Sequence, residues 1–124
     1  MLYAGIALVI LTGLGIIAIG IGYVLAPAAM AKGFGLPAWP TEERTQARLN
    51  LKGIRDIVSG LVLLVPLAMG QFQLVGWLML VASITPFGDA STILRYRGRK
   101  SVAYGVHAAT ALVVVIGGAL LLLS

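Results

Sequence analysis

The 124-residue sequence contains no cysteine and only one histidine, His107. Without cysteine the chain cannot form disulfides, use a thiolate as a nucleophile or bind a metal through sulfur. A single histidine also disfavours a zinc or copper site, because such sites usually take several histidine or cysteine ligands from the protein. We therefore expect no metal site, and the sequence indicates no cofactor.

Charged side chains are scarce as well. They make up 10% of the sequence, whereas hydrophobic residues make up 60%, and the mean hydropathy is +1.02. A soluble domain is typically about 45–50% apolar and about 25% charged. A water-soluble core of this chain length cannot bury so large an apolar excess. The composition therefore predicts an integral membrane protein with a single domain over residues 1–124.

Four apolar segments are each long enough to cross a bilayer, which takes about 20 helical residues. They cover about residues 2–26, 48–69, 74–94 and 102–123. The connections between them are short, which favours antiparallel neighbours. We therefore expect an all-α fold in which four transmembrane helices form an up-down-up-down bundle.

The second apolar segment has an amphipathic extension at its start, about residues 41–48. Thr41 is suited to be the N-cap of a helix, and acidic residues in the first turn suit the helix dipole. No helix breaker follows, so we expect one helix from about residue 41 to 69. The residues before it, 30–40, are rich in glycine and proline and predict a turn, in which Trp39 suits a membrane interface.

The charged residues, nine basic and four acidic, lie in two clusters, residues 32–56 and 89–100. With four spans, both clusters fall on one side of the membrane, and the two termini fall on the other. The positive-inside rule places the clusters in the cytoplasm and predicts a multi-pass protein of the cell (inner) membrane. Orientation and attraction to anionic membrane lipids explain the basic loop 95–100, so we expect no nucleic-acid partner.

Ionisable residues also occur inside the apolar segments. Arg55, Asp56, Asp89 and His107 each lie about five residues from a segment end, which is roughly 8 Å deep at 1.5 Å per residue. A charge at the bilayer centre costs about 2.5–3.5 kcal/mol, so these groups should face the bundle interior and pair. The sequence thus predicts a buried ionic layer near the cytoplasmic leaflet.

Helical spacing suggests the pairs within this layer. Lys52 and Asp56 share a helix face, whereas Arg55 points about 100° away and shares a face with Ser59. We expect Arg55 to pair with Asp89, and Asp56 to pair with Lys52 or His107, because a buried cluster should be neutral. The alternative is that the cluster only fixes the helices in register.

The layer supplies the candidate site residues. Asp89 follows Pro86 in a stretch where freed carbonyl groups can line a cavity, which favours it as an acid or proton carrier. His107 has Tyr104 one turn before it and is either a proton relay or a hydrogen-bonded structural residue. The candidate catalytic residues are Asp89, Asp56 and His107, and the candidate substrate-binding residues are Arg55, Lys52, Ser59 and Tyr104.

Several short motifs resemble those of a known family. They are Tyr23-Val-Leu-Ala-Pro27, Gly33-Phe-Gly-Leu-Pro37, Gly53-Ile-Arg55-Asp56-Ile-Val-Ser-Gly60 and Gly88-Asp89-Ala90. With these motifs the chain resembles a family of small four-span bacterial and fungal membrane proteins of unknown function, broadly similar to DoxX-like proteins. The resemblance implies a four-helix membrane fold with Arg55, Asp56 and Asp89 as marked polar positions, and it implies no settled activity.

Three functions fit these features. The favoured one is a pocket that binds a lipophilic small molecule, such as a quinone or isoprenoid, with its polar end at Arg55 and acid/base chemistry from the acidic residues or His107. The second is an accessory or structural subunit of a larger membrane complex, docked through the small-residue face Ala18, Gly22 and Ala26. The third is a proton-coupled small-molecule transporter that works as a homo-oligomer, namely a dimer. Against it, charge occurs only in the cytoplasmic half, and no matching polar groups lie towards the outside. Whether the protein is an enzyme stays open.

Overall fold

The computed structural model describes residues 1–38 and 42–124, and all regular structure in these residues is helical. The long helices are α1 (Leu2–Leu25), α3 (Glu43–Ala68), α4 (Phe72–Ala82), α5 (Ile84–Arg95) and α7 (Ala109–Leu122). The short elements are α2 (Pro27–Gly33), α6 (Lys100–Val102) and the π-helix η1 (Ala103–Ala108). The helix expected from about residue 41 is therefore present as α3, while Thr41 and Trp39 lie outside the described residues.

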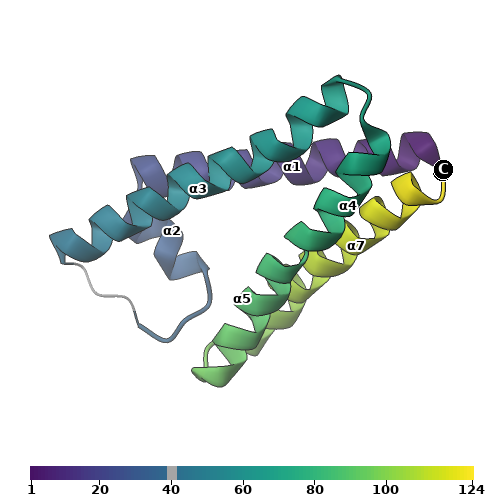
Figure 1. The fold of residues 1–124 in the computed structure, drawn as a ribbon. Helices are drawn as coiled ribbons and strands as arrows, with labels where there is room; N and C mark the ends of the chain where they lie inside the picture. The colour runs from purple at the N-terminus through teal and green to yellow at the C-terminus, as the bar shows by residue number, and fades with distance from the viewer. Residues whose placement is uncertain (39–41) are drawn as a thin grey trace.

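The long helices form two antiparallel pairs that splay apart (Figure 1). One pair is α1 with α3, and the other is α4 and α5 with η1 and α7. The pairs meet where the start of α1 lies beside the C-terminus, and they diverge towards the other end. There α2 and residues 34–38 occupy the opening of the V. The expected all-α fold is thus confirmed, with its long helices arranged as two splayed pairs.

Close approach of glycines holds each pair together. A Cβ atom on Gly20 would meet the backbone carbonyl of Gly53, and a Cβ atom on Gly60 would meet that of Gly13. In the other pair, a Cβ atom on Gly118 would meet a backbone carbonyl of α4. Small residues at such positions let helix backbones pack directly against each other, as is common between membrane helices.

The hydrophobic core lies at the closed end of the V. Its buried side chains come from both helix pairs: Val9, Leu63, Val75, Met79, Val114 and Leu121. Away from this core, large apolar side chains are exposed along every long helix, for example Leu14, Val62, Val81 and Leu112. So large an exposed apolar surface is unfavourable in water but suits contact with lipid.

Three helical stretches are long and apolar enough to cross a membrane: Leu2–Leu25, Phe72–Arg95 and Lys100–Leu122. These stretches support the expectation of a membrane protein. The expected span at about residues 48–69 is not among them. It corresponds to most of α3, where the charged residues Arg48, Lys52, Arg55 and Asp56 interrupt the apolar sequence.

Two of these stretches are irregular inside, and a further helix replaces part of an expected turn. Helices α4 and α5 are separated at Ser83, because Pro86 has no N–H to donate to the carbonyl four residues earlier. In η1 the N–H of Ala109 donates to the carbonyl of Tyr104, five residues back. The turn expected from residue 30 begins only after Gly33, because α2 starts at Pro27, a favourable first helical residue.

The contact between Gly20 and Gly53 gives a first prediction. Gly20→Ala should lower the free energy of unfolding by about 1–3 kcal/mol, because the new methyl group meets a backbone carbonyl that cannot move freely. The matched control is Gly15→Ala in the same helix, where a Cβ atom meets nothing within 4 Å. This control should be neutral or gain up to about 1 kcal/mol from helix propensity. Equal thermal stabilities of the two variants in detergent would contradict the packing described here.

Candidate functional site

Six residues from five parts of the chain converge where the helix pairs diverge. We call them the polar centre: Tyr23 of α1, Phe34 after α2, Lys52 and Asp56 of α3, Asp89 of α5 and His107 of η1. They form one connected set through ion pairs, ring contacts and longer-range electrostatic interactions. Of the candidate catalytic residues, Asp89 and His107 lie at ion-pair distance, and Asp56 lies within electrostatic range of Asp89.

Lys52 is enclosed by a carboxylate and two aromatic rings. Its Nζ atom lies 2.7 Å from Oδ2 of Asp56, one helical turn further along α3. The same atom lies 4.2 Å from the ring centroid of Tyr23 and 5.8 Å from that of Phe34. Aromatic faces attract cations at such distances, most strongly where water is excluded. Lys52 therefore links α3 electrostatically to α1 and to the segment after α2.

His107 connects the second helix pair to the same segment. Its Nδ1 atom lies 3.7 Å from Oδ2 of Asp89, and its Nε2 atom lies 3.1 Å from the backbone carbonyl oxygen of Phe34. The His107 and Phe34 rings also touch, with centroids 4.6 Å apart. The His107 side chain is 14% exposed and that of Asp89 is 32% exposed, so the carboxylate is the more accessible partner.

Asn50 holds α1 and α3 together next to the polar centre. Its Nδ2 atom donates to the carbonyl oxygens of Tyr23 at 2.9 Å and Val24 at 3.1 Å. These carbonyls belong to the last turn of α1, where they lack partners in their own helix. Asn50 thus fixes the end of α1 against α3, beside the ring that faces Lys52. Sequence reasoning missed Asn50, Tyr23 and Phe34, because their roles come from contacts between distant segments.

The two ion pairs that the sequence predicts have different outcomes. The pairing of Asp56 with Lys52 is confirmed. The pairing of Arg55 with Asp89 is wrong, because Asp89 lies against His107 and Arg55 lies on the exposed side of α3. In residues 1–38 and 42–124 no salt bridge involves Arg55. The reason is the helical offset of about 100° between Arg55 and Asp56, which lets only one of them face the polar centre.

The other two candidate substrate-binding residues lie outside the polar centre. Ser59 is exposed, and its hydroxyl donates to the carbonyl of Arg55 in the same helix at 2.8 Å. Tyr104 is 60% exposed, although it precedes His107 by only three residues. Neither side chain therefore contributes to the cluster of charges, and any role for them lies at its periphery.

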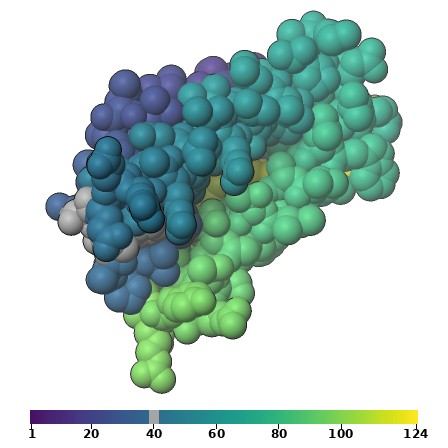
Figure 2. All heavy atoms as spheres, turned by 60° about the vertical axis from the view of Figure 1, so that its left-hand side comes forward, coloured from purple at the N-terminus to yellow at the C-terminus, as the bar shows by residue number. Residues whose placement is uncertain are grey.

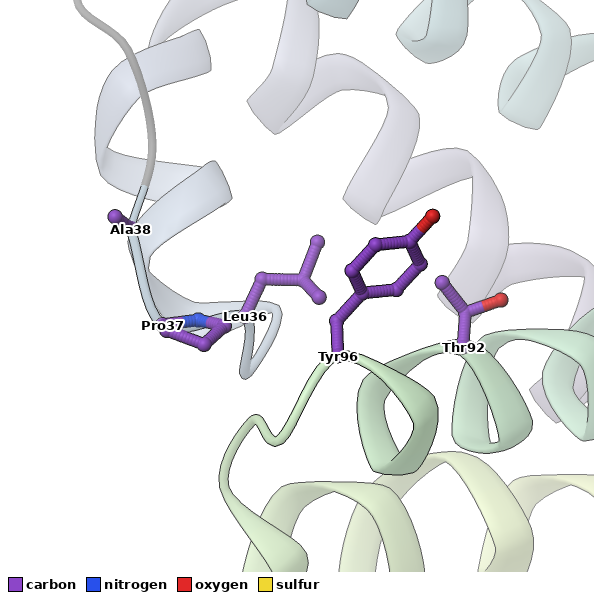
Figure 3. A pocket seen from close by; sticks show the side chains of 5 residues that line it. All are labelled: Leu36, Pro37, Ala38, Thr92 and Tyr96. Carbon is purple, nitrogen blue, oxygen red and sulfur yellow. The ribbon is translucent and has the colours of Figure 1, made fainter.

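A shallow pocket of about 290 Å³ lies between the segment after α2 and the second half of α5. Leu36, Pro37 and Ala38 form one wall, and Thr92 and Tyr96 of α5 form the other, with the Leu36 side chain pointing towards the Tyr96 ring (Figure 3). Thr92 follows Asp89 by three residues and so lies on a neighbouring part of the same helix face. In the space-filling view, atoms of α7 are visible in yellow between α3 and the green helices α4 and α5 (Figure 2).

Fold and site together define a small all-helical protein with three apolar stretches of membrane-spanning length and a polar centre between splayed helix pairs. The family model described as "Domain of unknown function (DUF4267)" matches residues 13–121, a range that includes the whole polar centre. The chain therefore belongs to this family, which confirms the expected membership of a family of unknown function. The match does not support the expected similarity to DoxX-like proteins. No curated protein and no solved structure matches the chain.

The Lys52–Asp56 pair gives a second prediction. Lys52→Met should lower the free energy of unfolding by about 1–3 kcal/mol, because it leaves the largely buried Asp56 carboxylate without its partner. The double variant Lys52→Met/Asp56→Leu should recover most of this loss, since both charges are then gone. Arg55→Met, the matched control three residues away, should change stability by less than about 0.5 kcal/mol. A double variant no more stable than Lys52→Met would contradict this pairing.

Proposed function

We propose that the chain is a four-span protein of the cell (inner) membrane, with α3 as the fourth span. The support comes from packing. Gly53 lies against Gly20, and Leu64 lies against Gly13, so the two helices run side by side over this length. A bilayer that surrounds α1 therefore also surrounds α3 from about residue 50 onwards. Two of the three charged residues in that stretch, Lys52 and Asp56, neutralise each other within the polar centre.

The orientation follows from where the charges gather. The guanidinium of Arg99 donates to the carbonyl of Lys32, so the two charged loops lie together at the open end of the V. Both termini lie at the closed end. By the positive-inside rule, the open end faces the cytoplasm and both termini face the other side. Basic side chains at the open end would also contact the anionic membrane lipids of the inner leaflet.

We further propose that the polar centre binds the head group of a lipophilic small molecule that enters from the cytoplasmic leaflet. The observation that carries this proposal is the convergence of two charged pairs in the gap between the helix pairs. One pair lies within α3, and the other joins α5 to η1. Among residues 1–38 and 42–124 no salt bridge connects α3 to α5. The charges therefore do little to fix the helix pairs in register, which favours a binding role over a purely structural one.

The pocket beside Thr92 and Tyr96 offers an entry to this centre. Its lining is largely apolar, which suits a hydrocarbon tail, and the partly exposed Asp89 lies one turn away. Asp89, Asp56 and His107 would then exchange a proton with the head group. Arg55 and Ser59, exposed on the neighbouring flank of α3, would meet the ligand only at its rim.

The accessory-subunit hypothesis is less well supported by the packing. Of the small-residue face Ala18, Gly22 and Ala26, the middle residue lies against the side chain of Met30 in α2. A partner helix would have to displace this contact to use the whole face. For a transporter, the described ionisable groups lie almost entirely at one end, which leaves no polar path to the other.

The binding proposal gives a third prediction, with decylubiquinone as the probe and the protein in lipid nanodiscs. Saturable binding is expected. Thr92→Trp should abolish it, because the indole fills the pocket, whereas Ser91→Trp, about 100° round α5 and outside the pocket lining, should not. Asp89→Asn should weaken it about tenfold or more, which is the loss of one hydrogen bond to a charged group. Binding that is absent, or that Thr92→Trp leaves unchanged while the protein stays folded, would overturn the proposed site.

A further inference from the structure

The hydrogen bond from His107 to Phe34 defines which ring nitrogen carries hydrogen. The partner of Nε2 is a backbone carbonyl oxygen, 3.1 Å away. A carbonyl oxygen can only accept a hydrogen bond, so Nε2 must be the donor. Because backbone atoms do not titrate, this constraint holds at every pH at which the fold persists. The carbonyl of Phe34 therefore selects the Nε2–H form of the His107 ring.

The other ring nitrogen then faces a conflict. In a neutral ring with hydrogen on Nε2, Nδ1 carries a lone pair. Its neighbour is Oδ2 of Asp89 at 3.7 Å, which is also an acceptor when the carboxyl group is ionised. Two acceptors facing each other in a partly buried site repel. One proton resolves the conflict, whether it resides on Nδ1 or on the carboxyl group.

The charges around the pair favour the same conclusion. Lys52 and Asp56 of α3 lie within electrostatic reach of Asp89 and cancel each other, and Tyr23 of α1 is neutral. If neither Nδ1 of His107 nor the Asp89 carboxyl group carries a proton, the polar centre has a net charge of one negative unit. If one of them carries a proton, the centre is neutral, which is the state that an apolar surrounding favours.

We propose that Asp89 and His107 share a single proton and present it to a ligand head group that has a hydrogen-bond-accepting carbonyl oxygen. At 3.7 Å, the two groups are too far apart for a good hydrogen bond to each other. When the proton resides on Asp89, its carboxyl group can therefore donate to a third acceptor, and Asp89 shares its face of α5 with Thr92, which lines the pocket. This inference rests on the proposed function and specifies the head group that the site takes. Phe34 acts here as a positioning residue through its backbone.

The single histidine makes the proton state directly measurable. In protein labelled with ¹⁵N-histidine, one-bond coupling to hydrogen shows which nitrogens of His107 are protonated, and an infrared carboxyl band lost in Asp89→Asn reports protonated Asp89. At neutral pH we expect Nε2 protonated, together with either a second ring proton or protonated Asp89. In Asp89→Asn the ring should be neutral with hydrogen on Nε2, whereas the control Ser91→Ala, an exposed position of α5 that leaves the charge of the polar centre unchanged, should match the parent protein. An Nδ1–H ring, or a neutral ring beside ionised Asp89, would overturn the inference.

An experiment with added ligand distinguishes the shared-proton inference from the ligand-binding proposal on which it rests. Decylubiquinone should shift the His107 signals, whereas decylbenzene, which has the same tail but no carbonyl group, should not. If decylubiquinone binds without shifting the His107 signals, the head-group assignment fails while lipophilic binding stands. If decylubiquinone does not bind at all, the proposed function fails, and the shared proton is judged by the ligand-free spectra alone.

Discussion

The cost of placing charge in hydrocarbon governs this structure. An ionisable group that faces the interior of an apolar bundle needs a partner, because an unpaired charge at mid-membrane costs about 2.5–3.5 kcal/mol. Lys52 satisfies this need with Asp56 and with the Tyr23 ring, and Asp89 satisfies it with His107. Arg55, on the exposed side of α3, does not face the interior. The paired groups come from α1, α3, α5 and η1, and they gather where the helix pairs diverge. The segment after α2 completes that centre through Phe34.

Glycine contacts and the hydrophobic core determine where this centre can exist. Direct backbone contact at Gly20 and Gly53 draws α1 and α3 together, and the core around Met79 joins the helix pairs at the terminal end. From this core the pairs diverge towards the charged end, where the chain segment 34–38 contacts both of them. The π-helical turn η1 carries His107 into the polar centre. Such π-helical turns often occur at functional sites.

The apolar segments, the long helix α3 and the gathering of ionisable groups from separate helices could be predicted from hydropathy, helix signals and residue counting. The Lys52–Asp56 pair followed from helical spacing. The partner of Asp89 could not be predicted, because equal depth does not tell which way Arg55 points, and the splay of the helix pairs decides it. The roles of Tyr23, Phe34 and Asn50 could not be predicted either. The Tyr23 ring contacts Lys52 and the Phe34 carbonyl contacts His107 only because the fold brings distant segments together.

The contact between Phe34 and His107 tests the central claim most directly, because it requires the segment after α2 to lie between the helix pairs. The chain has one histidine and three phenylalanines, so a nuclear Overhauser cross-peak between these ring protons can be assigned in nanodiscs. With ring centroids 4.6 Å apart, we expect a strong cross-peak that survives Phe72→Leu and Phe87→Leu and disappears in Phe34→Leu. A cross-peak that is absent, or that persists in Phe34→Leu, would show that no such centre forms.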